Sequence, residues 1–130
     1  MSQLKNKIKS LAENFFNDTV EIRRHLHTYP ELSFKEYKTS EYIQHKLSLY
    51  GIPFRSGLVE TGVVGLIKGK KPNSKCIALR ADIDALPIQE LNDLDYISKN
   101  NGVMHACGHD VHTASLLAVG RLLNELKEDW

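Results

Sequence analysis

The spacing of apolar residues predicts a long helix at the start of the chain. It starts after Ser2 and runs to about His27, and Pro30 stops it. Its apolar stripe has the spacing of an amphipathic helix and consists of Leu4, Ile8, Leu11, Phe15, Ile22 and Leu26.

A second helix is predicted to open at residues 33–36, whose Ser-Phe-Lys-Glu sequence has the form of a capping box. Gly51 lies just past its expected end. The side of this helix that we expect to be buried holds Phe34, Tyr37, Ile43 and Leu47.

Beyond Ile52 the pattern changes to short apolar runs. Residues 63–67 and 76–80 are predicted strands, and residues 70–75 between them have the composition of a hairpin turn. Residues 82–103 carry no sustained period and are expected to be mostly loop. Helical spacing returns over residues 113–127, and helices followed by strands and a helix indicate a layered α/β domain. The apolar positions of this last helix are Leu116, Val119, Leu123 and Leu126.

Charge and composition exclude several kinds of partner. The 130 residues carry a net charge of +1, so no overall field favours nucleic acid or an anionic membrane. No stretch reaches membrane-spanning length, and residues 1–10 lack the apolar run of a secretory signal. We therefore expect a cytoplasmic protein, in which Cys76 and Cys107 stay reduced and have separate roles.

Residues 104–112 concentrate metal-binding side chains directly ahead of the last predicted helix. Cys107 and His109 could bind one ion if the backbone there is extended, which Gly108 allows. The ion would lie over the start of the helix, where unpaired N–H groups favour a thiolate. Two alternatives remain open: a capped loop with Asp110 as the helix cap, and a catalytic thiol at Cys107 with a nearby histidine as base.

A second polar cluster follows the predicted strand 76–80. Strand alternation puts Asp82 and Asp84 on the same side, where they could orient a ligand histidine or bind metal directly. The common alternative for either aspartate is a turn or a helix cap. For His25 and His27 the simplest interpretation is contact with free carbonyls at the end of the first helix.

Three segments in this order resemble one family of enzymes. They are residues 23–34 (RRHLHTYPELSF), 79–87 (LRADIDALP) and 104–110 (MHACGHD). The family comprises the dinuclear-metal amidohydrolases related to aminoacylase, hippurate hydrolase, N-acetyldiaminopimelate deacetylase and the plant auxin-conjugate hydrolases. Its fold implies a partial αβα layered catalytic domain like that of zinc peptidases.

The resemblance implies roles for particular residues. Cys107 and His109 would bind the metal pair, Asp84 would be a supporting carboxylate, and Asp82 would be a weaker one. His105 and His112 would be neighbours of the site. The cofactor would be two divalent ions, for which zinc, manganese, nickel and cobalt are all suitable. The substrate would be an N-acyl amino acid, cleaved by metal-activated water with a glutamate as general base.

The chain departs from this family in length. Family members continue into a Glu-Glu pair, further histidine ligands and a lid domain that often forms a homodimer, and no glutamate here matches the general base. We therefore expect residues 1–130 to be the N-terminal portion of the catalytic domain, truncated after the helix that follows the Cys-Gly-His motif and inactive alone. The alternatives are a non-catalytic remnant that binds metal or a partner, and a cysteine hydrolase.

Overall fold

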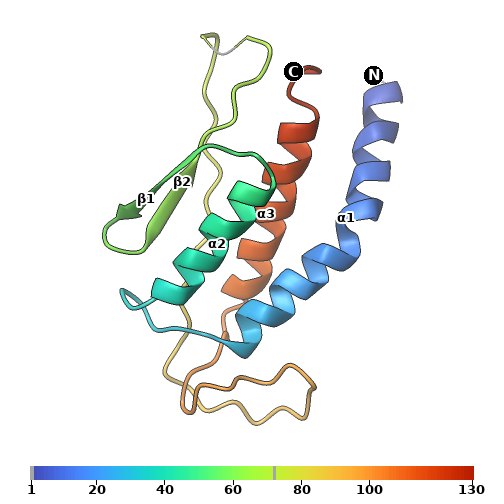
Figure 1. Ribbon diagram of the computed structural model, residues 1–130. Coiled ribbons are helices and arrows are strands. Elements are labelled where there is room, and N and C mark those ends of the chain that lie inside the picture. The colour runs from blue at the N-terminus through green and yellow to red at the C-terminus, as the bar shows by residue number, and fades with distance from the viewer. Residues whose placement is uncertain (1, 72) are drawn as a thin grey trace.

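The computed structural model describes residues 2–71 and 73–130, and this part of the chain forms a mixed α/β fold (Figure 1). None of its helices combines the length and apolar character needed to cross a membrane. Its elements in chain order are α1 (Ser2–Thr28), α2 (Tyr37–Leu49), β1 (Phe54–Leu58), β2 (Gly62–Gly65) and α3 (His109–Glu125).

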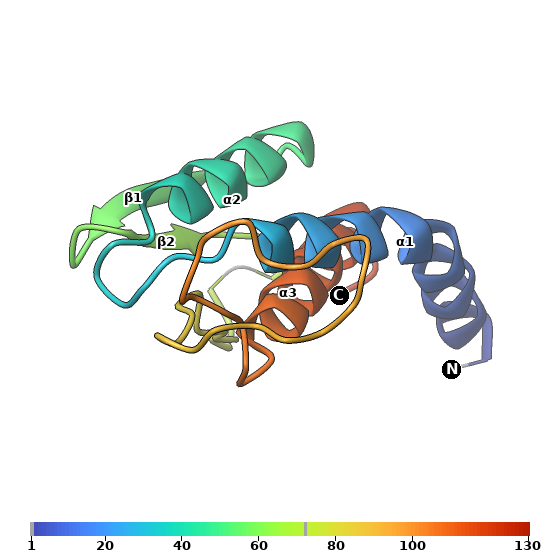
Figure 2. The ribbon, with the colours of Figure 1, turned by 90° about the horizontal axis from the view of Figure 1, so that it is seen from below.

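Helix α3 joins the other elements together. It contacts both α1 and α2, while α2 also packs on the hairpin of β1 and β2 (Figure 2). The long connection from β2 to α3 passes close to the end of α1 and the start of α3 (Figure 1). That connection carries two of the three sequence motifs.

Helix α1 forms over the predicted residues, but only its second half contributes to the core. Leu4 and Ile8 remain 37% and 40% exposed, whereas Ile22 and Leu26 are almost completely buried. The first turns extend away from the other elements (Figure 2). The core therefore lies where the second half of α1 meets α2 and α3, and its buried residues are Ile22, Leu26, Ile43, Leu47, Ile52, Ala114 and Leu117.

The start of α2 differs from the predicted capping box. The helix begins at Tyr37, and no side chain of its N-cap residue Glu36 caps it. Glu31 takes that place, because its carboxylate accepts hydrogen bonds from the backbone N–H groups of Lys38 and Thr39. Glu36 instead accepts a buried hydrogen bond of 2.8 Å from Thr61, which holds the hairpin turn.

The other predictions for α2 have mixed outcomes. Ile43 and Leu47 are buried, as expected, but Phe34 and Tyr37 are 64% and 53% exposed. Both lie at or before the true helix start, so the helical period does not apply to them. Gly51 has φ +66 and ends the helix as expected, since its N–H and that of Ile52 bind carbonyls of the last turn.

The predicted strand pairing is wrong. Strand β2 pairs antiparallel with β1, with Phe54 opposite Gly65 and Ser56 opposite Val63. β1 is largely exposed, so it has no apolar alternation in the sequence. A short loop joins β1 to β2, so the two strands pair as neighbours in the sequence.

Residues 76–80 form no strand, and the side chains of Ile77 and Cys76 are exposed. An apolar run becomes a strand only where a neighbouring backbone pairs with it, and the described residues supply no such neighbour here. The expected hairpin turn at 70–75 includes Pro72, which lies outside the described residues.

Helix α3 begins at His109, four residues before the predicted start. Its buried face holds Asp110, Thr113, Ala114 and Leu117, while Val119 is 41% exposed. The prediction placed the start too late because the first turn is polar. Its buried residue is an aspartate, which does not contribute to a period of apolar residues. Residues 82–103 are mostly loop, as predicted, apart from isolated bridges that pair Ala85 with Leu32 and Leu86 with Met104.

Replacing Ile22 with alanine is expected to lower the free energy of unfolding by about 3 kcal/mol, because the side chain is 1% exposed at the meeting point of the helices. Ile8→Ala, on the exposed half of α1, should change it by less than about 0.5 kcal/mol. Urea unfolding followed by circular dichroism measures both. Equal losses in the two variants would contradict this placement of the core.

Candidate metal centre

The first residue of α3 is held by an aspartate from the second motif. Nδ1 of His109 lies 3.0 Å from Oδ1 of Asp84 and 3.0 Å from the Asp84 carbonyl oxygen. Both oxygens are acceptors, so Nδ1 carries the proton and donates it. The other ring nitrogen, Nε2, then holds the lone pair that a metal ion could bind.

Backbone contacts hold Asp84 in this position. The N–H of Ala85 donates to the carbonyl of Glu31, and Leu86 exchanges two backbone hydrogen bonds with Met104. On the other side the hydroxyl of Thr113, one turn into α3, donates to the carbonyl of Asp82. These contacts bring the three sequence motifs together around one point at the start of α3.

Cys107 lies in a turn immediately before α3, and its side chain is exposed. The expectation of an extended backbone from Cys107 to His109 is wrong. Gly108 is left-handed, at φ 79 and ψ 20, and His109 is already helical. Glycine adopts this conformation without the strain that a side chain would add.

The remaining predicted site residues lie in different surroundings. The carboxylate of Asp82 pairs with Arg80 at the surface and makes no contact with His109. The ring of His112 lies 5.9 Å from that of His109. In the described residues no group of three or more histidine, cysteine, aspartate or glutamate side chains gathers where it could hold a metal ion.

His105 is buried, and within residues 2–71 and 73–130 neither of its ring nitrogens has a hydrogen-bond partner. Burial lowers the pKa of its imidazole, an effect that the nearby Asp110 carboxylate opposes. The lowered pKa favours the neutral form of this ring, which lies three residues before Gly108.

Sequence reasoning missed a buried polar cluster beside this site. Nδ1 of His27 lies 2.7 Å from Oδ2 of Asp110, and its Nε2 lies 3.0 Å from Oε1 of Glu90. Arg23 completes the cluster, because its Nε lies 2.9 Å from the same oxygen of Asp110. We call His27, Asp110, Glu90 and Arg23 the polar clamp.

Two sequence interpretations are corrected by the polar clamp. His27 does not bind carbonyls at the end of α1, and Asp110 is not the cap of α3 but is 1% exposed inside its first turn. The one available signal was that Arg23 and His27 are four residues apart, and so share a face of α1 next to the apolar stripe.

Glu90 is ionised in this setting. Burial by itself would raise the pKa of its carboxyl group, but hydrogen bonds from Asn92, His27 and the backbone N–H of Ser98 together lower it to about 2. The clamp therefore contains a buried negative charge that depends on the donors around it.

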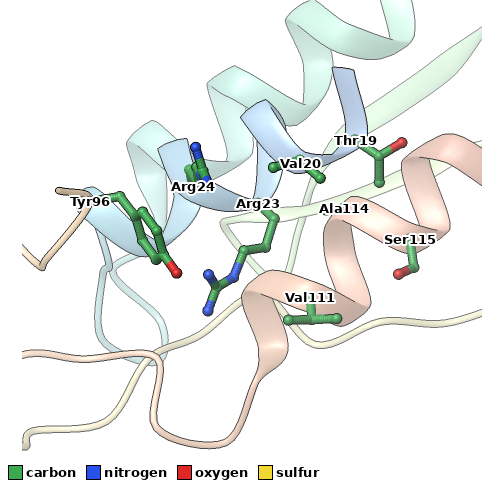
Figure 3. A pocket seen from close by; sticks show the side chains of 8 residues that line it. All are labelled: Thr19, Val20, Arg23, Arg24, Tyr96, Val111, Ala114 and Ser115. Carbon is green, nitrogen blue, oxygen red and sulfur yellow. The ribbon is translucent and has the colours of Figure 1, made fainter. Parts of the chain in front are cut away.

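Arg23 also lines a shallow pocket of about 280 Å³ between α1 and α3 (Figure 3). Its guanidinium group lies 4.9 Å from the ring centre of Tyr96, and that of Arg24 lies 5.0 Å from the same ring. Figure 3 shows the Arg23 side chain reaching between Tyr96 and Val111. Tyr96 thereby ties the loop to the end of α1 through cation–π contacts.

Comparison with known proteins adds independent information. Residues 78–130 match the model of the peptidase family M20/M25/M40. An N-acyl-L-amino acid amidohydrolase of Geobacillus stearothermophilus is 45% identical over 96% of this chain and 34% of its own length. An IAA-amino acid hydrolase of Arabidopsis thaliana is 43% identical over 99% of this chain and 30% of its own length.

A solved structure agrees with this match. The Bacillus subtilis YXEP protein, described as a dinuclear metal binding peptidase from family M20, superimposes with a TM-score of 0.84 at 45% identity. The alignment covers 88% of this chain and 32% of that one. The chain spans about a third of the length of the relatives it matches. Since sequence and fold agree along most of its residues, the chain belongs to the peptidase family M20/M25/M40.

Proposed function

We propose that residues 1–130 are the N-terminal portion of the metal-binding catalytic domain of an amidohydrolase that cleaves the amide bond of N-acyl amino acids. Cys107 and His109 bind divalent metal, and Asp84 orients His109. A cytoplasmic location, a lid domain and a dimer formed through it belong to the same proposal for the longer protein.

The observation that carries this proposal is the contact between His109 and Asp84. A metal-binding histidine usually donates its second ring N–H to a carboxylate or carbonyl, which orients the ring and makes the other nitrogen a better ligand. Nδ1 of His109 makes both kinds of contact at 3.0 Å. A histidine that only started a helix would not need a carboxylate and a carbonyl from a distant segment to hold its ring.

The position of Cys107 supports the same assignment. It lies in the turn immediately before α3, two residues from His109, and its side chain is exposed. A thiolate and an imidazole are suitable ligands for zinc, manganese, nickel or cobalt. A bound divalent ion would supply acidified water and a polarised amide carbonyl.

Hydrolysis also needs a base, and the well-buried glutamates of the described residues are already engaged. Glu36 accepts from Thr61, and Glu90 accepts from His27, Asn92 and Ser98. Neither is free to take a proton from water. The catalytic glutamate is therefore expected in the part of the family's length that these residues do not span.

A non-catalytic, metal-binding remnant is the second candidate. It is favoured by one observation, that the described residues contain no group of three or more histidine, cysteine, aspartate or glutamate side chains that could hold a metal ion. The two candidates agree on the metal ligands and differ only in turnover.

Cys107→Ser and His109→Ala are each expected to abolish retention of zinc or manganese, because each removes one of the two proposed ligands. The metal content after dialysis measures this. Cys76→Ser and His45→Ala are matched controls, since both residues are exposed and lie outside the site. Wild-type metal content in both site variants would refute the ligand assignment.

Asp84→Asn is expected to weaken zinc binding by about 10- to 100-fold, because the amide no longer supports the His109 ring as a carboxylate does. Asp82→Asn, which alters only the surface pair with Arg80, should leave the affinity within about twofold. Competition with a zinc-binding dye measures both constants. A larger loss in Asp82→Asn than in Asp84→Asn would reverse the roles given to these aspartates.

The purified 130 residues are expected to show no measurable hydrolysis of N-acetyl or N-benzoyl amino acids, even with added manganese or zinc, because a general base is missing. Release of the free amino acid is the measurement. Turnover that a chelator abolishes would show that this chain is catalytically complete, and would reject the remnant as well.

A further inference from the structure

The polar clamp joins three parts of the chain that are far apart in sequence. His27 belongs to the last turn of α1, Glu90 to the loop before α3, and Asp110 to the first turn of α3. All three side chains are at least 95% buried. Each ring nitrogen of His27 lies within hydrogen-bond distance of a carboxylate oxygen.

The buried carboxylate of Asp110 anchors the start of α3, together with the hydroxyl of Thr113, which donates to the carbonyl of Asp82, and the packing of Ala114 in the core. The N-cap residue of α3 is Gly108, which has no side chain to cap the free N–H groups. Asp110 is the acidic residue of this first turn, and its Oδ2 is held by His27 and Arg23 at 2.7 and 2.9 Å. The contacts of Asp110 therefore contribute to the direction in which the first turn points.

His109 is the neighbour of Asp110, and its ring must meet Asp84 from that same turn. A small rotation of the first turn would move the His109 ring away from the Asp84 carboxylate. The hydrogen bond of 3.0 Å tolerates only a few tenths of an ångström before it weakens.

We propose that His27 is a positioning residue: by bridging Glu90 and Asp110 it sets the first turn of α3 and thereby keeps the His109 ring on Asp84, ready to bind metal. This inference rests on the proposed role of His109 as a ligand. It gives the first motif of the chain a task in the site, although none of its residues touches His109 in the described structure.

The test compares variants that remove the bridge with one that only destabilises the same helix. His27→Phe keeps a ring but removes both ring nitrogens that contact the carboxylates. Glu90→Gln weakens the bridge at its Glu90 end. The carboxylate oxygens of Glu90 contact nitrogens of His27, Asn92 and Ser98, and the amide NH₂ of glutamine cannot accept a hydrogen bond from them. Leu26→Ala is the control, since Leu26 is as buried as His27 but makes no contact in the clamp.

The first readout is the ¹H–¹⁵N correlation spectrum of the histidine rings in the metal-free chain of 130 residues. The measured quantity is the ratio of His109 rings whose Nδ1 is protonated and hydrogen-bonded to His109 rings in all other forms. We expect this ratio to fall by about tenfold or more in His27→Phe, because losing a hydrogen bond to a charged group changes an equilibrium by about that factor. Glu90→Gln should change it in the same direction, and Leu26→Ala should leave it unchanged.

The second readout is zinc affinity by dye competition, which should fall by about 10-fold or more in His27→Phe and stay within about twofold in Leu26→Ala. If the wild-type chain binds no zinc, the ligand proposal fails while the ring spectrum still decides the role of His27. If His27→Phe does not fold, Glu90→Gln decides it. An unchanged His109 signal in a folded variant would overturn the inference.

Discussion

The buried contact between His27 and Asp110 is the interaction on which the arrangement of this chain depends. A carboxylate that is 1% exposed is tolerated only if it is paired, because an isolated buried charge loses its hydration without compensation. His27 and Arg23 supply that pairing from α1. The end of the first helix and the start of the last one are therefore held together by a polar contact, and not by the apolar core alone.

The same contact organises the loop that has no regular structure of its own. Glu90 binds the far side of His27, the N–H of Lys99 donates to the carbonyl of Thr28, and the Asn100 side chain donates to the carbonyl of Pro30. A long connection without helices or strands gains its order from such anchors. Here the anchors converge on the end of α1, so the position of residues 82–103 depends on the position of that end of the helix.

Apolar packing and polar contacts therefore have different tasks. Ile22, Leu47 and Leu117 bring the helices together, but burial is non-directional and allows small rotations. Hydrogen bonds with narrow geometry set the angles, through Asp110 at one end of α3 and Glu31 at the start of α2. A ligand histidine needs this directional control, since its ring must face both a supporting carboxylate and an ion.

Local pattern determined much of this protein. The period of α1, the burial of Ile43 and Leu47, the stop at Gly51 and the irregular stretch 82–103 follow from residues close in sequence, because helical spacing and glycine conformation are local properties. The three motifs also indicated the family correctly. Tertiary structure alone decided the pairing of β1 with β2, the capping of α2 by Glu31 and the clamp around His27. The clamp joins His27 and Asp110, which are 83 residues apart. The hairpin and the Glu31 cap join residues close in sequence, but they involve an exposed strand and a polar side chain, which no apolar periodicity records.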